Sequence, residues 1–108
     1  MPGSTIGRGN ILVSMLIGPT LTPTSVAAAT TAEQSFSIPG LQPTDFINVS
    51  FNGTQTAGMA VENARCATAG VLLMAFSNDT AGTLTPASGV YIIGIDRAEN
   101  LPLPVNAQ

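Results

Sequence analysis

The side chains that could carry out acid–base or nucleophilic chemistry are few in this chain and lie far apart. The 108 residues include no histidine and no lysine, and the chain has three arginines, six carboxylates and one cysteine, Cys66. General acid–base catalysis usually uses a histidine or a carboxylate with a shifted pKa, and a cysteine nucleophile needs a neighbouring base. Cys66 stands in an apolar setting, which favours a buried structural thiol. We therefore expect a protein that is not an enzyme.

Sites for metals and glycans are also weakly indicated. A structural zinc site needs about four Cys or His ligands, and one cysteine cannot supply them. Glu62 and Asp79 offer carboxylates, but no loop of regularly spaced carboxylates is present as a calcium site requires. Asn48, Asn52 and Asn78 each begin an Asn-X-Ser/Thr sequence, which matters only in a eukaryotic secretory context. We expect no metal and no cofactor.

Charge is scarce along the whole chain. Only 8% of the residues are charged and the net charge is −3, whereas about 25% are charged in an ordinary soluble protein. Nucleic-acid binding needs clustered basic side chains, and Arg8, Arg65 and Arg97 are scattered, so we expect no nucleic-acid partner. Domains that remain free in solution carry charged residues, lysine in particular, on their surfaces and sheet edges. These charges prevent association with other chains. A chain without lysine and with a mean hydropathy of +0.36 is expected to be covered by partner chains, the alternative being a secreted or thermally hardy domain rich in Ser and Thr.

Apolar runs separated by turn residues predict an all-β fold. Val71–Phe76 and Val90–Ile95 suit buried strands, and the segment between them is rich in Ser, Asn, Thr, Gly and Pro. We expect three other strands, at Asn10–Ile17, Gln34–Ile38 and Phe46–Phe51. The last has Phe46, Val49 and Phe51 as apolar anchors, and Asn52-Gly53 after it is typical of a hairpin turn. Short strands about ten residues apart predict a small antiparallel, jelly-roll-like β-sandwich.

The segment Met59–Cys66 fits two structures. Glu62 and Arg65 are three residues apart, which is a helical spacing. Glycines bracket the segment closely at Gly58 and Gly70, and its neighbours are all expected to be strands. We therefore favour a strand here as well.

The two ends of the chain are expected to lie outside the sandwich. Residues 1–30 form an arm with one strand and an extended Thr/Pro linker, residues 31–98 form the sandwich, and residues 99–108 form an extended tail. The strand of the arm either adds to a neighbouring chain or is the first strand of its own sandwich, and both remain open. The apolar run Ile11–Ile17 is too short to span a membrane, so we expect no membrane partner.

The stretch from Thr31 to Arg97 resembles a family of small tailed-phage virion proteins described as structural, decoration or cement proteins. The similar pieces are TAEQSFSIPGL (31–41), AGMAVENARC (57–66), VLLMAFSN (71–78) and LTPASGVY (84–91). The resemblance implies a β-sandwich in the virion, on the outer surface of the capsid. It implies the major capsid protein as a partner, with neighbouring subunits cemented against internal DNA pressure. For contacts between copies, a homotrimer is our first expectation and a homodimer the second.

A set of interface residues follows from the apolar ends and the few cations. We expect the arm to contribute Ile11, Leu12, Val13, Leu16 and Ile17, and the tail to contribute Leu101, Leu103 and Val105. Arg65 and Arg97 are included because we expect them to pair with carboxylates, the alternative being arginines surrounded by solvent.

Two other classes of function stay open. A virion adhesion or carbohydrate-binding module needs exposed aromatic side chains for stacking on sugars, but the chain has one tyrosine, Tyr91, and no tryptophan. A secreted bacterial surface subunit that donates a strand suits the arm equally well. A signal peptide cleaved after Ala29 would favour that second class, yet the basic region holds only Arg8, and prolines separate the apolar run from the alanines.

Overall fold

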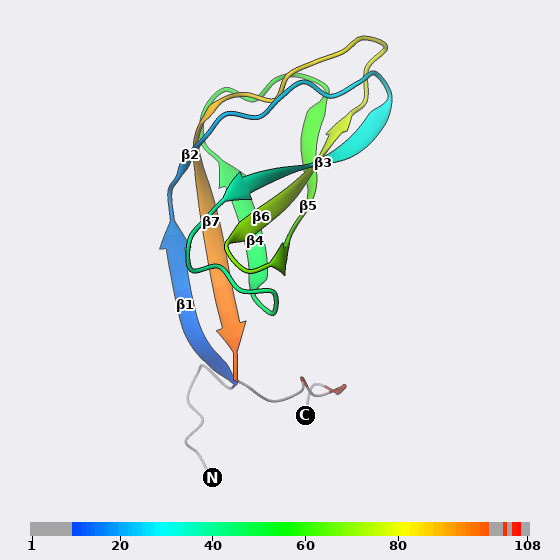
Figure 1. The fold of residues 1–108 in the computed structure, drawn as a ribbon. Coiled ribbons are helices and arrows are strands. Elements are labelled where there is room, and N and C mark those ends of the chain that lie inside the picture. Colours follow the sequence, from blue (N-terminus) through cyan, green and yellow to red (C-terminus); the bar gives the residue numbers. More distant parts are fainter. Residues whose placement is uncertain (1–9, 100–102, 104, 107–108) are drawn as a thin grey trace.

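The computed structural model describes residues 10–99, 103 and 105–106, and the regular structure among them is entirely β-strand. The strands are β1 (Ile11–Ile17), β2 (Thr20–Leu21), β3 (Thr30–Ser37), β4 (Phe46–Phe51), β5 (Met59–Thr68), β6 (Val71–Asn78) and β7 (Gly89–Ala98). They form two antiparallel sheets (Figure 1). The predicted small all-β sandwich is confirmed, and β5 is a strand, as favoured over a helix.

Each sheet is built around one central strand. β1 and β4 both pair with Ile93–Asp96 of β7, so they lie on opposite sides of it. β2 follows β1 and pairs with the first residues of β7, and Figure 1 shows β7 between β1 and β4. In the second sheet β6 is central, with β3 and β5 on its two sides. We name the two layers the β7 sheet and the β6 sheet.

From β2 to β5 the successive strands alternate between these sheets, and the chain returns from β6 to the β7 sheet at β7. β1 and β4 flank β7, and β3 and β5 flank β6. β5 and β6 are consecutive in the chain and pair with each other. Their turn contains Gly70 at φ +80°, a conformation that glycine adopts readily. This order is that of a jelly roll with a reduced number of strands. The prediction of a hairpin turn at Asn52-Gly53 is wrong. β4 belongs to the β7 sheet, and the chain crosses to the β6 sheet before β5.

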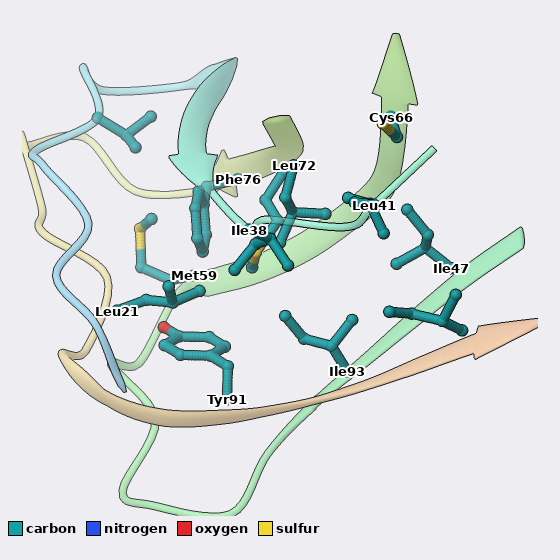
Figure 2. Close-up of a cluster of buried hydrophobic side chains, with 13 residues drawn as sticks. Leu21, Ile38, Leu41, Ile47, Met59, Cys66, Leu72, Phe76, Tyr91 and Ile93 are labelled. Atoms are coloured by element: carbon teal, nitrogen blue, oxygen red, sulfur yellow. The ribbon is translucent and has the colours of Figure 1, made fainter. Parts of the chain in front are cut away.

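Side chains from both central strands meet in the core. Alternate residues of each strand are buried, as the period of two in a β-strand requires. Figure 2 shows Tyr91 and Ile93 of β7 on one side of the core and Phe76 and Leu72 of β6 on the other. The other buried apolar residues are Leu21, Val26, Ile38, Leu41, Ile47, Met59, Cys66, Met74 and Ile95.

The structure corrects the expected boundary at residue 30. β1 pairs with β7 of its own chain, which selects the second of the two places left open for this strand. Leu21 and Val26, assigned from the sequence to a linker, are 6% and 1% exposed and belong to the core. Burial of these apolar side chains favours docking of the segment on the sandwich. The described residues up to 30 are therefore part of the domain.

Hydrogen bonds hold the same segment in place. Val26 and Leu84 exchange two main-chain hydrogen bonds, of 2.7 and 3.1 Å. The Gln34 side-chain amide exchanges two more with the main chain of Thr24, both at 2.8 Å. The bonds to Leu84 satisfy the main-chain groups of Val26, which burial would otherwise leave without partners.

β4 differs from the sequence prediction at its first residue. Ile47 is buried, and Val49 and Phe51 pack against the core, whereas Phe46 is 62% exposed. Because side chains alternate between the two faces of a strand, Phe46 lies on the face opposite to Val49 and Phe51. The prediction of Phe46 as a core anchor is wrong, and its exposure matters for the surface described next.

Candidate interaction surface

The outer side of the β7 sheet carries an unusual number of exposed apolar side chains. Leu16 of β1 is 75% exposed, Phe46 of β4 is 62% exposed and Val90 of β7 is 51% exposed. All three occupy positions that alternate with core-facing residues of their strands. We call this surface the β7 face. It comprises Ser14, Leu16, Phe46, Asn48, Ser50, Val90, Ile92, Gly94 and Asp96.

A shallow groove of about 500 Å³ crosses the middle of the β7 face. Gly94 lies at its centre between Leu16 and Asn48, and a methyl group placed on Gly94 would be 3.4 Å from Cδ2 of Leu16. Ser14 and Asp96 border the groove, and the Ser14 hydroxyl donates a 2.7 Å hydrogen bond to the Asp96 carboxylate. The groove therefore offers an apolar wall, a flat centre and a few polar groups, a composition typical of protein–protein contacts.

The outer side of the β6 sheet, which we call the β6 face, has a different chemistry. β3 presents exposed Thr31, Ser35 and Ser37 there. Arg65 of β5 donates two hydrogen bonds, of 2.6 and 2.8 Å, to Glu33 of β3. Because β3 and β5 flank β6, this ion pair crosses over the central strand, whose outward residues are half-buried. On the β6 face, the ion pair therefore lies over the outward side chains of β6.

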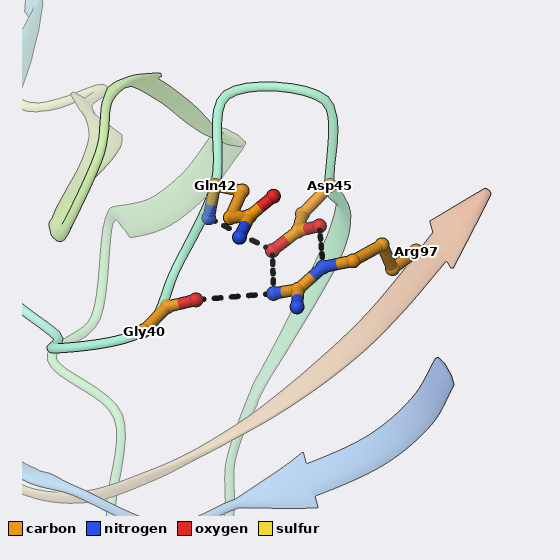
Figure 3. Close-up of polar contacts among 4 residues, drawn as sticks. All are labelled: Gly40, Gln42, Asp45 and Arg97. Atoms are coloured by element: carbon orange, nitrogen blue, oxygen red, sulfur yellow. Dashed lines mark hydrogen bonds and ion pairs between the residues drawn. The ribbon is translucent and has the colours of Figure 1, made fainter. Parts of the chain in front are cut away.

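A second ion pair fixes the connection between β3 and β4 to the end of β7 (Figure 3). Arg97 donates hydrogen bonds of 2.8 and 2.9 Å to the two carboxylate oxygens of Asp45, and a third of 3.0 Å to the Gly40 carbonyl. The Gln42 main-chain N–H donates to the same carboxylate at 3.0 Å. The Asp45 side chain is fully buried, and that of Arg97 is 23% exposed. This cluster joins two segments distant in sequence.

Both ion pairs shift the pKa of their carboxyl groups in the same direction. The hydrogen bonds from Arg97 lower the pKa of Asp45, and they outweigh the opposing effect of burial. The hydrogen bonds from Arg65 lower the pKa of Glu33 in the same way. The pairs differ in solvent access, because Arg65 and Glu33 are 50% and 34% exposed. The pairing of both arginines with carboxylates is confirmed, while their place in an interface stays a prediction.

The other predicted interface residues are not gathered on one surface. Within β1, Leu12 and Leu16 are exposed, whereas Ile11, Val13 and Ile17 are half-buried at the edge of the sheet. Leu103 and Val105 of the tail are 66% and 95% exposed. Leu101 lies outside the described residues.

The exposed apolar residues of the β7 face are the surface feature that the sequence did not indicate. Phe46 precedes an alternating series, Ile47, Val49 and Phe51, whose inward direction follows from a period of two. That alternation could have placed Phe46 outside the core. Val90 and Ile92 sit in a continuous apolar run, in which periodicity cannot separate inward from outward residues.

The polar side chain of Asn78 has a structural role. Asn78 is 2% exposed, and its amide donates hydrogen bonds to the Val26 and Gly82 carbonyls at 3.0 and 2.9 Å. Its carbonyl oxygen accepts a hydrogen bond from the Thr80 hydroxyl at 2.7 Å. Burial of this amide closes the Asn78 sequence motif to glycosylation in the folded protein. Sequence inspection missed its structural role because its partners are remote main-chain groups.

A second cavity, of about 290 Å³, lies beside the connection between β4 and β5. None of its lining residues is charged, and its one phenol, Tyr91, donates a 2.6 Å hydrogen bond to the Ala87 carbonyl. Burial raises the pKa of Tyr91, and the ring stacks at a tilt on Phe51 with centroids 4.5 Å apart. Tyr91 is therefore a core residue and presents no ring surface to a sugar.

Comparison of the chain with models of known protein families, with curated proteins and with solved structures found no match. Among the described residues, no helix has the length and apolar character needed to cross a membrane. The same part of the chain contains no group of three or more His, Cys, Asp or Glu side chains placed to hold a metal ion.

Proposed function

We propose that this protein is a structural virion protein that binds the outer surface of a phage capsid. It cements neighbouring major capsid protein subunits and stabilises the head against internal DNA pressure. The observation that carries this proposal is the β7 face, where Leu16, Phe46 and Val90 are more than half exposed. Large apolar side chains exposed together on one face are typical of interaction sites in soluble proteins.

The chemistry of the β7 face suits a permanent contact with a large protein surface. Such interfaces are broad and more hydrophobic than transient ones, and charged residues are depleted at their centres. Asp96 is the charged residue within the β7 face, and its carboxylate accepts a hydrogen bond from Ser14. Placing this face on the capsid would remove its apolar side chains from water with little loss of charge hydration.

The resemblance to capsid decoration proteins supports the same function. Its pieces 31–41, 57–66 and 71–78 supply β3, β5 and β6, which together are the whole β6 sheet. The fourth piece, 84–91, leads into β7. The resemblance therefore covers the sheet whose outer face is polar, while much of the proposed contact face comes from β1 and β4.

The predicted interface residues take different parts in this proposal. Leu12 and Leu16 contribute exposed apolar contacts at one edge of the β7 face, and Leu103 and Val105 do so from the tail. Arg97 acts indirectly, because its hydrogen bonds to Asp45 and Gly40 hold the end of β7 against the adjoining loop.

The test is co-sedimentation with empty heads assembled from the major capsid protein of the same genome. Changing Phe46 and Val90 together to Asp places two charges on the β7 face, and we expect this variant to stay in the supernatant. A matched variant changes Ser35 and Ser37, exposed on the β6 face, to Asp, and we expect it to sediment with the heads like the wild type. Failure of the wild-type protein to bind would contradict the proposal.

A further inference from the structure

β1 leaves one of its two edges without a strand partner in the described chain. It pairs with β7 along one edge, and no other described strand pairs with it. Its sequence, ILVSMLI, has neither a charged residue nor a proline. Proteins commonly use charge and proline to prevent exposed edges from pairing with other chains, so this edge is open to strand addition.

The register identifies which main-chain groups point out of that edge. The Tyr91 N–H donates a 3.0 Å hydrogen bond to the Pro19 carbonyl, and the register is unbroken from there through Ile17↔Ile93 to Val13↔Arg97. Main-chain groups in an antiparallel strand point alternately toward and away from its partner. Residues 13, 15 and 17 therefore bond to β7, and Ser14 and Leu16 direct their N–H and C=O groups to the open edge.

The sequence of β1 is nearly symmetric about Ser14. The residues three positions away on both sides are isoleucines, those two positions away are leucines, and those one position away are the apolar Val13 and Met15. An antiparallel pair of identical strands with a two-fold axis at Ser14 places these like residues opposite each other. This symmetry points to a second copy of the same chain as the partner.

We propose that two copies of this protein associate through β1, antiparallel about a two-fold axis at Ser14. In this pairing the N–H of each Ser14 donates to the C=O of Ser14 of the second copy. The two β7 sheets join into one continuous sheet, whose contact is isologous, meaning that both copies use the same patch. The inference concerns self-association and holds whether or not the protein binds a capsid.

Side-chain exposure agrees with this pairing. Met15 is 42% exposed and Leu16 is 75% exposed in the single chain. The pairing sets Met15 opposite Val13 of the second copy and Leu16 opposite Leu12 of the second copy. The β-bulge of β1 lies between Ile11 and Val13, so the centre of the contact, from Val13 to Met15, is regular. Antiparallel pairing of β1 with itself closes at two copies and therefore favours the dimer over the trimer.

The first test uses Ser14→Pro and Ser14→Ala, with the mass in solution measured by sedimentation equilibrium. Proline removes the N–H that points out of the edge and leaves the hydrogen bonds of β1 to β7 in place, because proline is tolerated where a strand's N–H faces solvent. Both variants lack the Ser14 hydroxyl, and the alanine variant keeps the N–H. We expect the wild type and Ser14→Ala to have twice the mass of the 10.9 kDa chain and Ser14→Pro to have half of that dimer mass. A monomeric or trimeric wild type, or a folded Ser14→Pro variant that stays dimeric, would overturn the proposal.

The second test does not depend on the folding of a proline variant. Ser14→Cys places two thiols on the axis, where the hydrogen-bonded pair separates Cα atoms by about 5.5 Å, within the range of a disulfide. With oxidised glutathione as oxidant, we expect this variant to form a covalent dimer on a non-reducing gel. Ser50→Cys, on β4 of the same face, is the matched control and should stay single, and the native Cys66 is 5% exposed. Absence of the Ser14→Cys cross-link, or equal cross-linking by Ser50→Cys, would contradict the two-fold contact.

Discussion

The two sheets of this protein have similar inner faces and different outer faces. Inside, β6 and β7 each present a row of buried apolar side chains to the shared core. Outside, the β6 face carries serines, threonines and the Arg65–Glu33 pair, while the β7 face exposes Leu16, Phe46 and Val90. The β6 sheet has an outer face suited to water, and the β7 sheet has one suited to another protein. This difference is the basis of the proposal that the β7 face makes the contacts with the capsid.

The largest expected effect tests the similarity of the inner faces. Phe76→Ala on β6 and Ile93→Ala on β7 each delete a nearly fully buried side chain. Each should lower the free energy of unfolding by about 3–4 kcal/mol, from lost burial and from the cavity left behind. Urea unfolding followed by circular dichroism measures both. A loss below about 1 kcal/mol for either variant would show that the two sheets do not share one core.

The two ion pairs should differ in how much they contribute to the free energy of unfolding. Asp45→Ala leaves the Arg97 guanidinium without its buried partner and should cost about 3 kcal/mol of unfolding free energy. Glu33→Ala breaks the exposed pair with Arg65 on the β6 face, and its effect should be much smaller because solvent already screens that pair. The same urea titration compares the variants. Equal losses would contradict the assignment of Arg97–Asp45 as the structural pair.

The dependence of stability on pH should reflect the buried pair of Arg97 and Asp45. Arg97 lowers the pKa of Asp45 in the folded protein below the ordinary value of 3.8. As the pH falls, the unfolded chain takes up this proton first, so the stabilisation present above pH 3.8 is lost as the pH passes down through the folded-state pKa. Thermal melts between pH 7 and pH 2 should show a smaller acid-induced fall in Tm for Asp45→Asn than for the wild type. An identical fall in both would contradict this role of Asp45.

The smallest expected effect on stability concerns the outer faces. Phe46→Ser on the β7 face and Ser35→Lys on the β6 face both change exposed residues. Each should change the free energy of unfolding by less than about 0.5 kcal/mol. Thermal melts at neutral pH measure the change. A loss above about 2 kcal/mol for Phe46→Ser would show that Phe46 supports the fold rather than an interface.

Local pattern predicted most of the strands. The run Phe46–Phe51 has the bounds that the structure shows, and β5, β6 and β7 begin at or within one residue of the expected position. These segments carry β-branched and apolar residues between glycines, prolines and asparagines, and such signals lie within each segment. The prediction of an all-β sandwich depended on these signals alone and is confirmed.

Contacts between distant segments could not be predicted in the same way. Leu21 and Val26 join the core because remote residues such as Leu84 provide hydrogen-bond partners for their segment. Asn52-Gly53 has the composition of a hairpin turn, yet the strands on either side belong to different sheets. The direction of Val90 and Ile92 depends on which side of β7 faces the core, and a continuous apolar run does not encode it.

The measurement that tests the central claim most directly is electron cryo-microscopy of heads assembled from the major capsid protein of the same genome and incubated with this protein. We expect additional density on the outer surface at subunit boundaries, with the β7 face, including Phe46 and Val90, against the capsid. The β6 face, with the Arg65–Glu33 pair, should point to solvent. Density that places the β6 face on the capsid, or heads without bound protein, would contradict the account.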